Sequence, residues 1–137
     1  MRKTAFFLIL LGTLNSCTPD NTNLPNYKYE VLPVDSFTLP EKFTLGETYD
    51  IKMKYKRPTD CHSFQGFYYD KNLNVRTIGI QTAEIESSNC KKITTDPIEV
   101  SFKFYVTSNG SYIFKFYKGE DANGKNTFTE VEIPVVK

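Results

Sequence analysis

Apolar and polar side chains alternate along most of this chain, and that period of two constrains its fold more than any other feature. The alternation extends from Tyr27 to the C-terminus, and no stretch sustains the 3.6-residue period of an amphipathic helix. Turn-forming Asp, Asn, Pro and Gly residues separate the alternating segments. The predicted strands cover residues 28–34, 48–56, 63–70, 74–86, 98–107, 111–118 and 127–136, with a short strand at 37–39.

The alternation also predicts which side chains are buried, because successive residues of a strand point to opposite faces. One face of each sheet is expected to be buried and the other exposed. The residues expected inside are Ile51, Met53, Tyr55, Phe102, Phe104, Tyr112, Phe114, Phe116, Val131 and Ile133. Seven such strands in about 110 residues predict an all-β fold, an antiparallel sandwich of two sheets.

The first 17 residues follow a different pattern. Arg2 and Lys3 precede an apolar run of about ten residues, which is too short for a transmembrane helix. The run ends in Leu14-Asn15-Ser16-Cys17, which resembles the lipobox of bacterial lipoproteins. That resemblance implies a signal peptide over residues 1–16 and a mature N-terminus at Cys17 carrying acyl chains such as palmitate. The alternative is an ordinary cleaved signal followed by an incidental cysteine.

Removal of the predicted signal peptide changes the charge of the chain. Arg2 and Lys3 are lost with no acid, so the formal net charge falls from +1 to −1. A chain with this balance has no basic surface for nucleic acid, and no nucleic-acid partner is expected. Residues 17–26 are polar, contain two prolines, and are expected to form a lipidated tether that leads to a domain at 27–137.

The two remaining cysteines, Cys61 and Cys90, are expected to pair. An even number of cysteines in an exported domain favours a disulfide, here closing a loop of about 30 residues. Closing such a loop stabilises a fold by roughly 3–4 kcal/mol in the chain-entropy model. The alternatives are a redox-active thiol and a metal site. The chain has no Cys-x-x-Cys, and its one histidine, His62, cannot complete a zinc site with these cysteines.

Two segments resemble parts of the immunoglobulin fold. Residues 46–51 (GETYDI) resemble the entry to strand B, and residues 109–114 (NGSYIF) resemble the run that enters strand F, with Tyr112 as the corner tyrosine. The core Trp is missing, and Cys61 and Cys90 flank the 63–86 hairpin instead of joining strands B and F. The whole chain is also similar in style to small lipoproteins of flavobacteria and other Bacteroidota, a resemblance that implies no activity.

Candidates for catalysis and metal binding are few. His62 lies in a predicted loop, and the adjacent Cys61 would point to the opposite side, so a Cys–His pair is not expected. Residues 121–124 (DANG) have the start of a calcium-loop spacing, but a hairpin turn explains them equally well. The acids Glu84 and Glu86 share one strand face, which does not suit a glycosidase. The sequence therefore predicts no enzyme, no cofactor and no metal.

Four tyrosines form the remaining candidate site. Tyr68, Tyr69, Tyr105 and Tyr117 lie partly on faces that alternation exposes, where aromatic rings stack on sugars or fill protein interfaces. The alternative is that tyrosine simply suits strands. We expect a lipid-anchored, non-catalytic binding module of the cell envelope, at the outer membrane on its periplasmic or outer face. A structural or assembly subunit of an envelope complex is the second interpretation, and a small hydrolase that uses His62 is the third.

Overall fold

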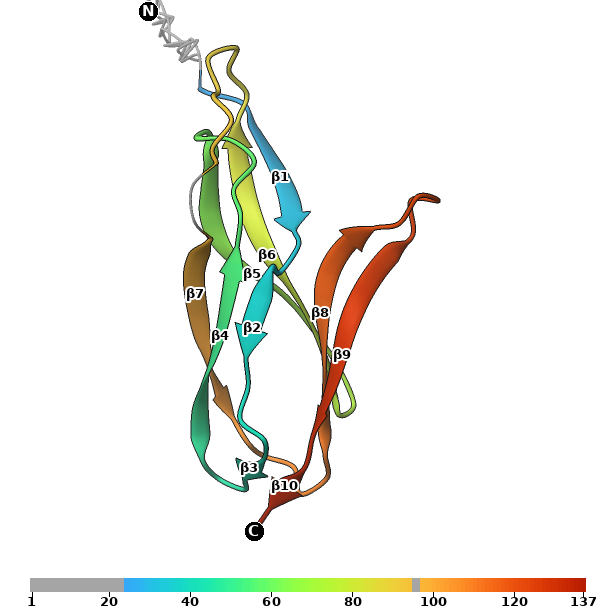
Figure 1. Cartoon of the computed structure of the whole chain (residues 1–137). Helices are drawn as coiled ribbons and strands as arrows, with labels where there is room; N and C mark the ends of the chain where they lie inside the picture. Colours follow the sequence, from blue (N-terminus) through green and yellow to red (C-terminus); the bar gives the residue numbers. More distant parts are fainter. Residues whose placement is uncertain (1–23, 95–96) are drawn as a thin grey trace, which may run out of the picture.

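The computed structural model describes residues 24–94 and 97–137 (Figure 1). The predicted signal peptide, Cys17 and most of the tether lie outside these residues. The described chain is all-β, and within it no helix is long and apolar enough to cross a membrane. The strands are β1 (Tyr27–Leu32), β2 (Ser36–Thr38), β3 (Phe43–Thr44), β4 (Thr48–Tyr55), β5 (His62–Asn72), β6 (Val75–Ile85), β7 (Ile98–Tyr105), β8 (Tyr112–Glu120), β9 (Asn126–Ile133) and β10 (Val135–Val136).

These strands form three sheets in an arrangement consistent with a β-sandwich (Figure 1). The largest sheet has five strands and is built around β6, which pairs with β5, with β1 and with β8. The strand β9 completes this sheet by pairing with β8. A second sheet contains β2, β4 and β7, and a two-stranded sheet joins β3 to β10. The strand β1 begins at one end of the domain, and the chain ends at the other (Figure 1).

The prediction of a purely antiparallel sandwich is wrong. The first residues of β6, Val75–Ile78, run parallel to Ile113–Phe116 of β8, and β3 runs parallel to β10. Between β6 and β8 the chain crosses into the second sheet to form β7 and then returns. It therefore enters β8 in the same direction as β6. Alternation determines the face of each residue but not the neighbour of each strand.

The prediction of one strand over residues 127–136 is also wrong in detail. Pro134 lies between β9 and β10, and a proline has no N–H to donate to a ladder. Its carbonyl instead accepts a hydrogen bond from the N–H of Phe43 (2.9 Å). The chain therefore leaves β8 at this point and pairs with β3.

One aromatic-rich core joins the sheets. Phe43, which is fully buried, packs within about 6 Å of the rings of four aromatic residues, Tyr49, Phe104, Tyr112 and Phe114. Phe37 of β2 stacks on Phe116 of β8 with ring centroids 4.0 Å apart. The alternation predicted this interior correctly in β4 and β8, where the buried side chains are Ile51, Met53, Tyr55, Tyr112, Phe114 and Phe116.

Tyr112 anchors the connection between β7 and β8. Its hydroxyl oxygen accepts hydrogen bonds from the backbone N–H groups of Thr107 (3.2 Å) and Ser108 (2.9 Å), and its ring is fully buried. Burial raises the pKa of Tyr112, but these donors and the charge of Arg76 lower it by more, so the pKa lies below its ordinary value. The phenol thus connects a buried ring to backbone groups that would otherwise lack partners.

Candidate functional site

The four tyrosines singled out in the sequence do not share one surface. Tyr68 and Tyr117 line one hollow, and Tyr69 and Tyr105 line another. Adjacent residues on a strand point to opposite faces, so Tyr68 and Tyr69 separate although they are neighbours in β5. The structure therefore divides the candidate binding face into two sites.

The first hollow, called here the outer hollow, has a volume of about 520 Å³ and lies on the face of the five-stranded sheet turned away from the core. Three aromatic rings line it, from Tyr68 of β5, Tyr117 of β8 and Phe128 of β9. The centroids of the Tyr117 and Phe128 rings are 5.9 Å apart. The remaining lining residues are mostly polar: Glu30, Val31, Thr77, Glu120 and Asn126.

The chemistry of the outer hollow mixes aromatic faces with hydrogen-bonding groups. Burial and, to a lesser extent, the charge of Glu120 raise the pKa of Tyr117, so its phenol keeps its proton at neutral pH. Tyr117 can therefore donate a hydrogen bond, Glu120 can accept, and the Asn126 amide can do both. Rings beside such groups suit a ligand that has both apolar C–H faces and hydroxyl groups.

The second hollow, called here the inner hollow, lies between β5 and β7. It is lined by Tyr69 and Tyr105, by other aromatic residues, and by the cations Lys71, Arg76 and Lys103. Burial raises the pKa of the Tyr69 phenol, and the nearby Arg76 guanidinium offsets part of that rise. A hollow with this lining favours an anion over a cation.

Arg76 is held in place by the fold itself. Its Nη1 donates to the carbonyls of Leu73 (2.7 Å) and Val75 (2.9 Å), and its guanidinium lies 5.0 Å from the centre of the Tyr112 ring. The side chain is 4% exposed, and its buried Nε has no hydrogen-bond partner among the described residues. Arg76 therefore serves mainly as a buried cation that the aromatic core stabilises.

The interpretation of His62 as a loop residue is wrong. His62 is the first residue of β5, its side chain is 3% exposed, and it pairs with Glu84 of β6. Its Nε2 lies 2.5 Å from Oε1 of Glu30 in β1 and 3.9 Å from Oε2 of Glu84. We call these three residues the Glu–His–Glu cluster. All three ligand atoms lie within 4.8 Å of one another.

The pairing of three strands brings the cluster together. β6 lies between β1 and β5 here, and Glu30 pairs with Thr82 while His62 pairs with Glu84. Residues 82 and 84 point to the same face of β6, so all three side chains of the cluster share it. This face is the one that buries Ile78 and Ile80 further along β6. The cluster therefore lies on the buried face of β6, beyond the apolar residues Ile78 and Ile80.

Sequence reasoning missed Glu30 and gave Glu84 no role with His62, although a signal was present. In the predicted strand 28–34, alternation places Glu30 on the same face as Leu32 and Val34, which are both buried. A carboxylate on the apolar face of a strand needs a partner nearby. What the sequence could not supply was the identity of that partner, since His62 is 32 residues away.

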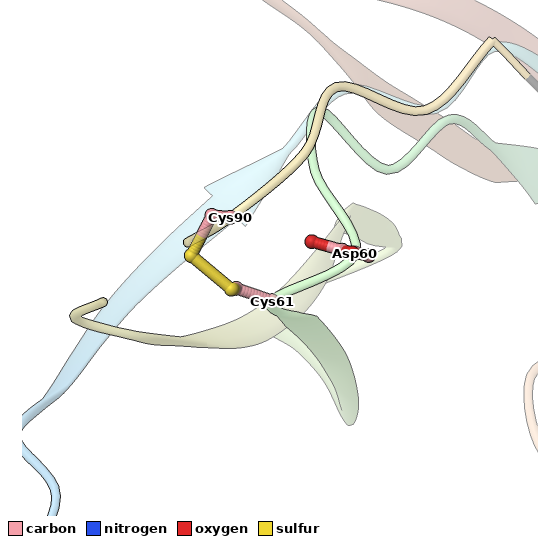
Figure 2. A group of neighbouring side chains, drawn as sticks. All are labelled: Asp60, Cys61 and Cys90. Atoms are coloured by element: carbon pink, nitrogen blue, oxygen red, sulfur yellow. A yellow bond between two sulfur atoms is a disulfide. The ribbon is translucent and has the colours of Figure 1, made fainter. Parts of the chain in front are cut away.

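The predicted disulfide between Cys61 and Cys90 is confirmed (Figure 2), with a Cα–Cα distance of 5.5 Å. Cys61 precedes β5 and Cys90 follows β6, so the bond closes the open end of that hairpin. Asp60 adds to the closure, because its Oδ1 accepts a hydrogen bond from the N–H of Lys91 (2.8 Å). With its sulfur atoms bonded, neither cysteine supplies the thiolate that catalysis or metal binding needs.

The disulfide also fixes the loop that supports His62. Thr59 forms an antiparallel bridge with Lys92, two residues from each cysteine. The Thr59 hydroxyl lies 2.8 Å from Nδ1 of His62 and accepts a hydrogen bond from the N–H of Cys61 (3.3 Å). The imidazole is thus held from one side by Thr59 and from the other by Glu30.

The structure places two hydroxyl groups beside His62, those of Ser63 and Thr59. Ser63 follows His62 on the strand and points the other way, where its hydroxyl donates to the carbonyl of Ala83 (3.1 Å). The hydroxyl that does contact the imidazole is that of Thr59, and neither the outer nor the inner hollow is lined by Thr59 or His62.

The DANG segment forms the turn between β8 and β9. The Asp121 Oδ1 accepts hydrogen bonds from the N–H groups of Asn123 (2.8 Å) and Lys125 (3.0 Å), and Gly124 has a positive φ of 74°. The carboxylate is therefore engaged with the backbone of its own turn.

Comparison of the chain with protein-family models, with curated proteins and with solved structures gave no significant match.

Proposed function

We propose that this protein is a lipid-anchored, non-catalytic module of the bacterial cell envelope that binds carbohydrate. The observation that carries the proposal is the outer hollow, where Tyr68, Tyr117 and Phe128 meet beside Glu120 and Asn126. Aromatic faces attract the C–H faces of sugar rings, and carboxylate and amide groups pair with sugar hydroxyls.

We also propose a fold class for the domain. We assign the domain to the broad immunoglobulin-like class, and the contacts of the Tyr112 hydroxyl support this assignment, since a corner tyrosine bonds to the backbone just upstream. The pairing of β4 with β7 in one sheet and of β8 with β9 in the other matches the B–E and F–G pairs of that class.

Carbohydrate binding is tested by titrating the soluble domain, residues 24–137, with soluble β-glucan, xylan and mannan. Binding of one of these by isothermal titration calorimetry is expected. Tyr68→Ala should weaken it at least about 10-fold, which corresponds to 1.4 kcal/mol. Tyr68 suits the test because its side chain is 48% exposed and its removal leaves the core intact.

Tyr105→Ala is the matched control. Tyr105 is 59% exposed and lines the inner hollow, so its loss should leave carbohydrate binding unchanged. An equal loss in both variants would place the ligand elsewhere. No binding to any of the three polysaccharides, together with a stoichiometric protein partner after mild solubilisation, would favour an assembly subunit instead.

The lipid anchor is tested separately in the full-length chain. Replacement of Cys17 with Ala removes the only thiol at the lipobox position, so the variant should not incorporate radiolabelled palmitate and should leave the membrane fraction. Fractionation of inner and outer membranes then tests the proposed outer-membrane location. Continued labelling of the Cys17→Ala chain would contradict the anchor but would leave the carbohydrate proposal standing.

A further inference from the structure

We propose that the Glu–His–Glu cluster binds one divalent transition-metal ion, with Zn²⁺ as the best fit. The cluster offers one imidazole nitrogen and two carboxylates from three adjacent strands. Three protein ligands with a further position for water are a common zinc arrangement, and zinc accepts both nitrogen and oxygen donors. Glu30 also lines the outer hollow, but His62 and Glu84 do not, and the inference does not rest on carbohydrate binding.

The distances need only a small adjustment to hold an ion. Bonds of about 2.1 Å at tetrahedral angles place neighbouring ligand atoms roughly 3.4 Å apart. Nε2 of His62 now lies 2.5 Å from the Glu30 oxygen and 3.9 Å from the Glu84 oxygen. One carboxylate oxygen would withdraw and the other approach, each by less than about 1 Å, which side-chain rotation alone can supply. The Nε2 proton would leave to solvent when the metal binds.

The charges of the cluster favour a cation. The side chains of Glu30 and Glu84 are only 30% and 24% exposed, and within the described residues neither has a lysine or arginine nitrogen within 4.0 Å. Arg57, the nearby guanidinium, donates from Nη1 to the backbone carbonyl of His62 (3.1 Å) and not to a carboxylate. Two carboxylates that share a partly buried space repel each other unless a proton or a metal ion lies between them.

The surroundings of His62 match those of a metal-binding histidine. Such a histidine usually directs its second ring nitrogen at a hydrogen-bond acceptor, which fixes the ring and its tautomer. The Thr59 hydroxyl occupies this position at 2.8 Å from Nδ1. Thr59 is held in turn by its bridge to Lys92 beside the Cys61–Cys90 disulfide. The imidazole is therefore positioned before any metal arrives.

The donor set discriminates among metals. Calcium requires six to eight oxygen ligands and magnesium prefers oxygen alone, so a site with an imidazole and two carboxylates suits neither. Zinc, or another first-row transition metal of similar softness, fits it better. The bound ion would join β1 to β5 across β6, next to the disulfide and at the end of the domain where β1 begins (Figure 1).

The test is zinc titration of residues 24–137, carrying no polyhistidine tag and kept oxidised so that no thiol competes. Calorimetry should show one Zn²⁺ per chain, and Zn²⁺ but not Ca²⁺ should raise the melting temperature. Glu84→Gln and Glu30→Gln should each weaken zinc binding at least about 10-fold. Thr59→Val keeps the ligands and should weaken binding about 10-fold by releasing the imidazole.

Glu86→Gln is the matched control, because Glu86 is exposed, lies just beyond Glu84 and is not part of the cluster. This variant should bind zinc as the wild type does. The wild-type titration does not depend on the folding of any variant, so a folded wild-type domain that ignores zinc overturns the proposal. Zinc binding that survives both Glu30→Gln and Glu84→Gln also overturns it, since the ion would then lie elsewhere.

Discussion

Gly79 and Val31 lie so close across the β1–β6 ladder that a side chain at Gly79 has no room. A Cβ built on Gly79 would lie 2.5 Å from Cγ1 of Val31 and 3.5 Å from Cβ of Tyr117. Val31 and Tyr117 both line the outer hollow. Because Gly79 has no side chain, Val31 of β1 and Tyr117 of β8 can both pack over β6 and line the hollow.

Replacement of Gly79 with Ala should destabilise the domain by about 1–3 kcal/mol, the usual cost of overpacking. Urea denaturation monitored by circular dichroism measures this difference. Gly110→Ala is the control, because a Cβ there meets only the Ser108 hydroxyl, at 3.9 Å. Equal stability of Gly79→Ala and the wild type would contradict the tight packing between β1 and β8.

Replacement of Cys61 with Ser should lower the stability of the oxidised protein by roughly 3–4 kcal/mol, since the disulfide spans 29 residues of sequence. Thermal melting should separate the variant from the wild type without reductant and bring them together when the wild type is reduced. Identical melting of both proteins under oxidising conditions would argue against the bond.

Replacement of Tyr112 with Phe leaves the buried ring in place but removes the acceptor of two backbone N–H groups, those of Thr107 and Ser108. We expect a loss of about 1–3 kcal/mol, the cost of leaving such donors without a partner. Tyr105→Phe provides the comparison, since Tyr105 is exposed, and it should change stability by less than about 0.5 kcal/mol. Similar losses in the two variants would show that the hydroxyl of Tyr112 has no special role.

Replacement of Arg76 with Lys should destabilise the domain by about 1–3 kcal/mol although the charge is kept. A planar guanidinium can donate to the carbonyls of Leu73 and Val75 while it lies over the Tyr112 ring, and an ammonium group cannot hold that geometry. Lys71→Met, in the same hollow but exposed, should have little effect. If Arg76→Lys were as stable as the wild type, only the charge of Arg76 would matter.

Replacement of Leu73 with Gly should stabilise the domain. Leu73 is 87% exposed and has a φ of 53°, a left-handed conformation in the two-residue turn between β5 and β6. Glycine takes this conformation without the steric cost that leucine bears, so a gain of about 0.5–1 kcal/mol is expected. Chemical denaturation measures it, with Leu73→Ala as the control that removes the exposed side chain but keeps the strain. A gain of equal size in Leu73→Ala would assign the effect to the side chain and not to the backbone.

Part of the candidate site follows from the sequence and part does not. Three of the four tyrosines predicted to lie partly on exposed faces, Tyr68, Tyr69 and Tyr105, are exposed, whereas Tyr117 is half-buried. The grouping of Tyr68 with Tyr69 in one candidate face overlooked the same alternation, because neighbouring strand residues point to opposite faces. The structure places these two rings in different hollows.

The sequence by itself determined an all-β chain, the buried faces of β4 and β8, and the Cys61–Cys90 pair. The first two follow from side-chain periodicity, which is read within one segment. The cysteine pair follows from a count over the whole chain, because only two cysteines remain beyond Cys17. Only the tertiary structure decided the parallel pairing of β6 with β8 and the meeting of Glu30, His62 and Glu84. Strand neighbours are chosen by long-range packing, in which residues distant in sequence compete for the same buried space.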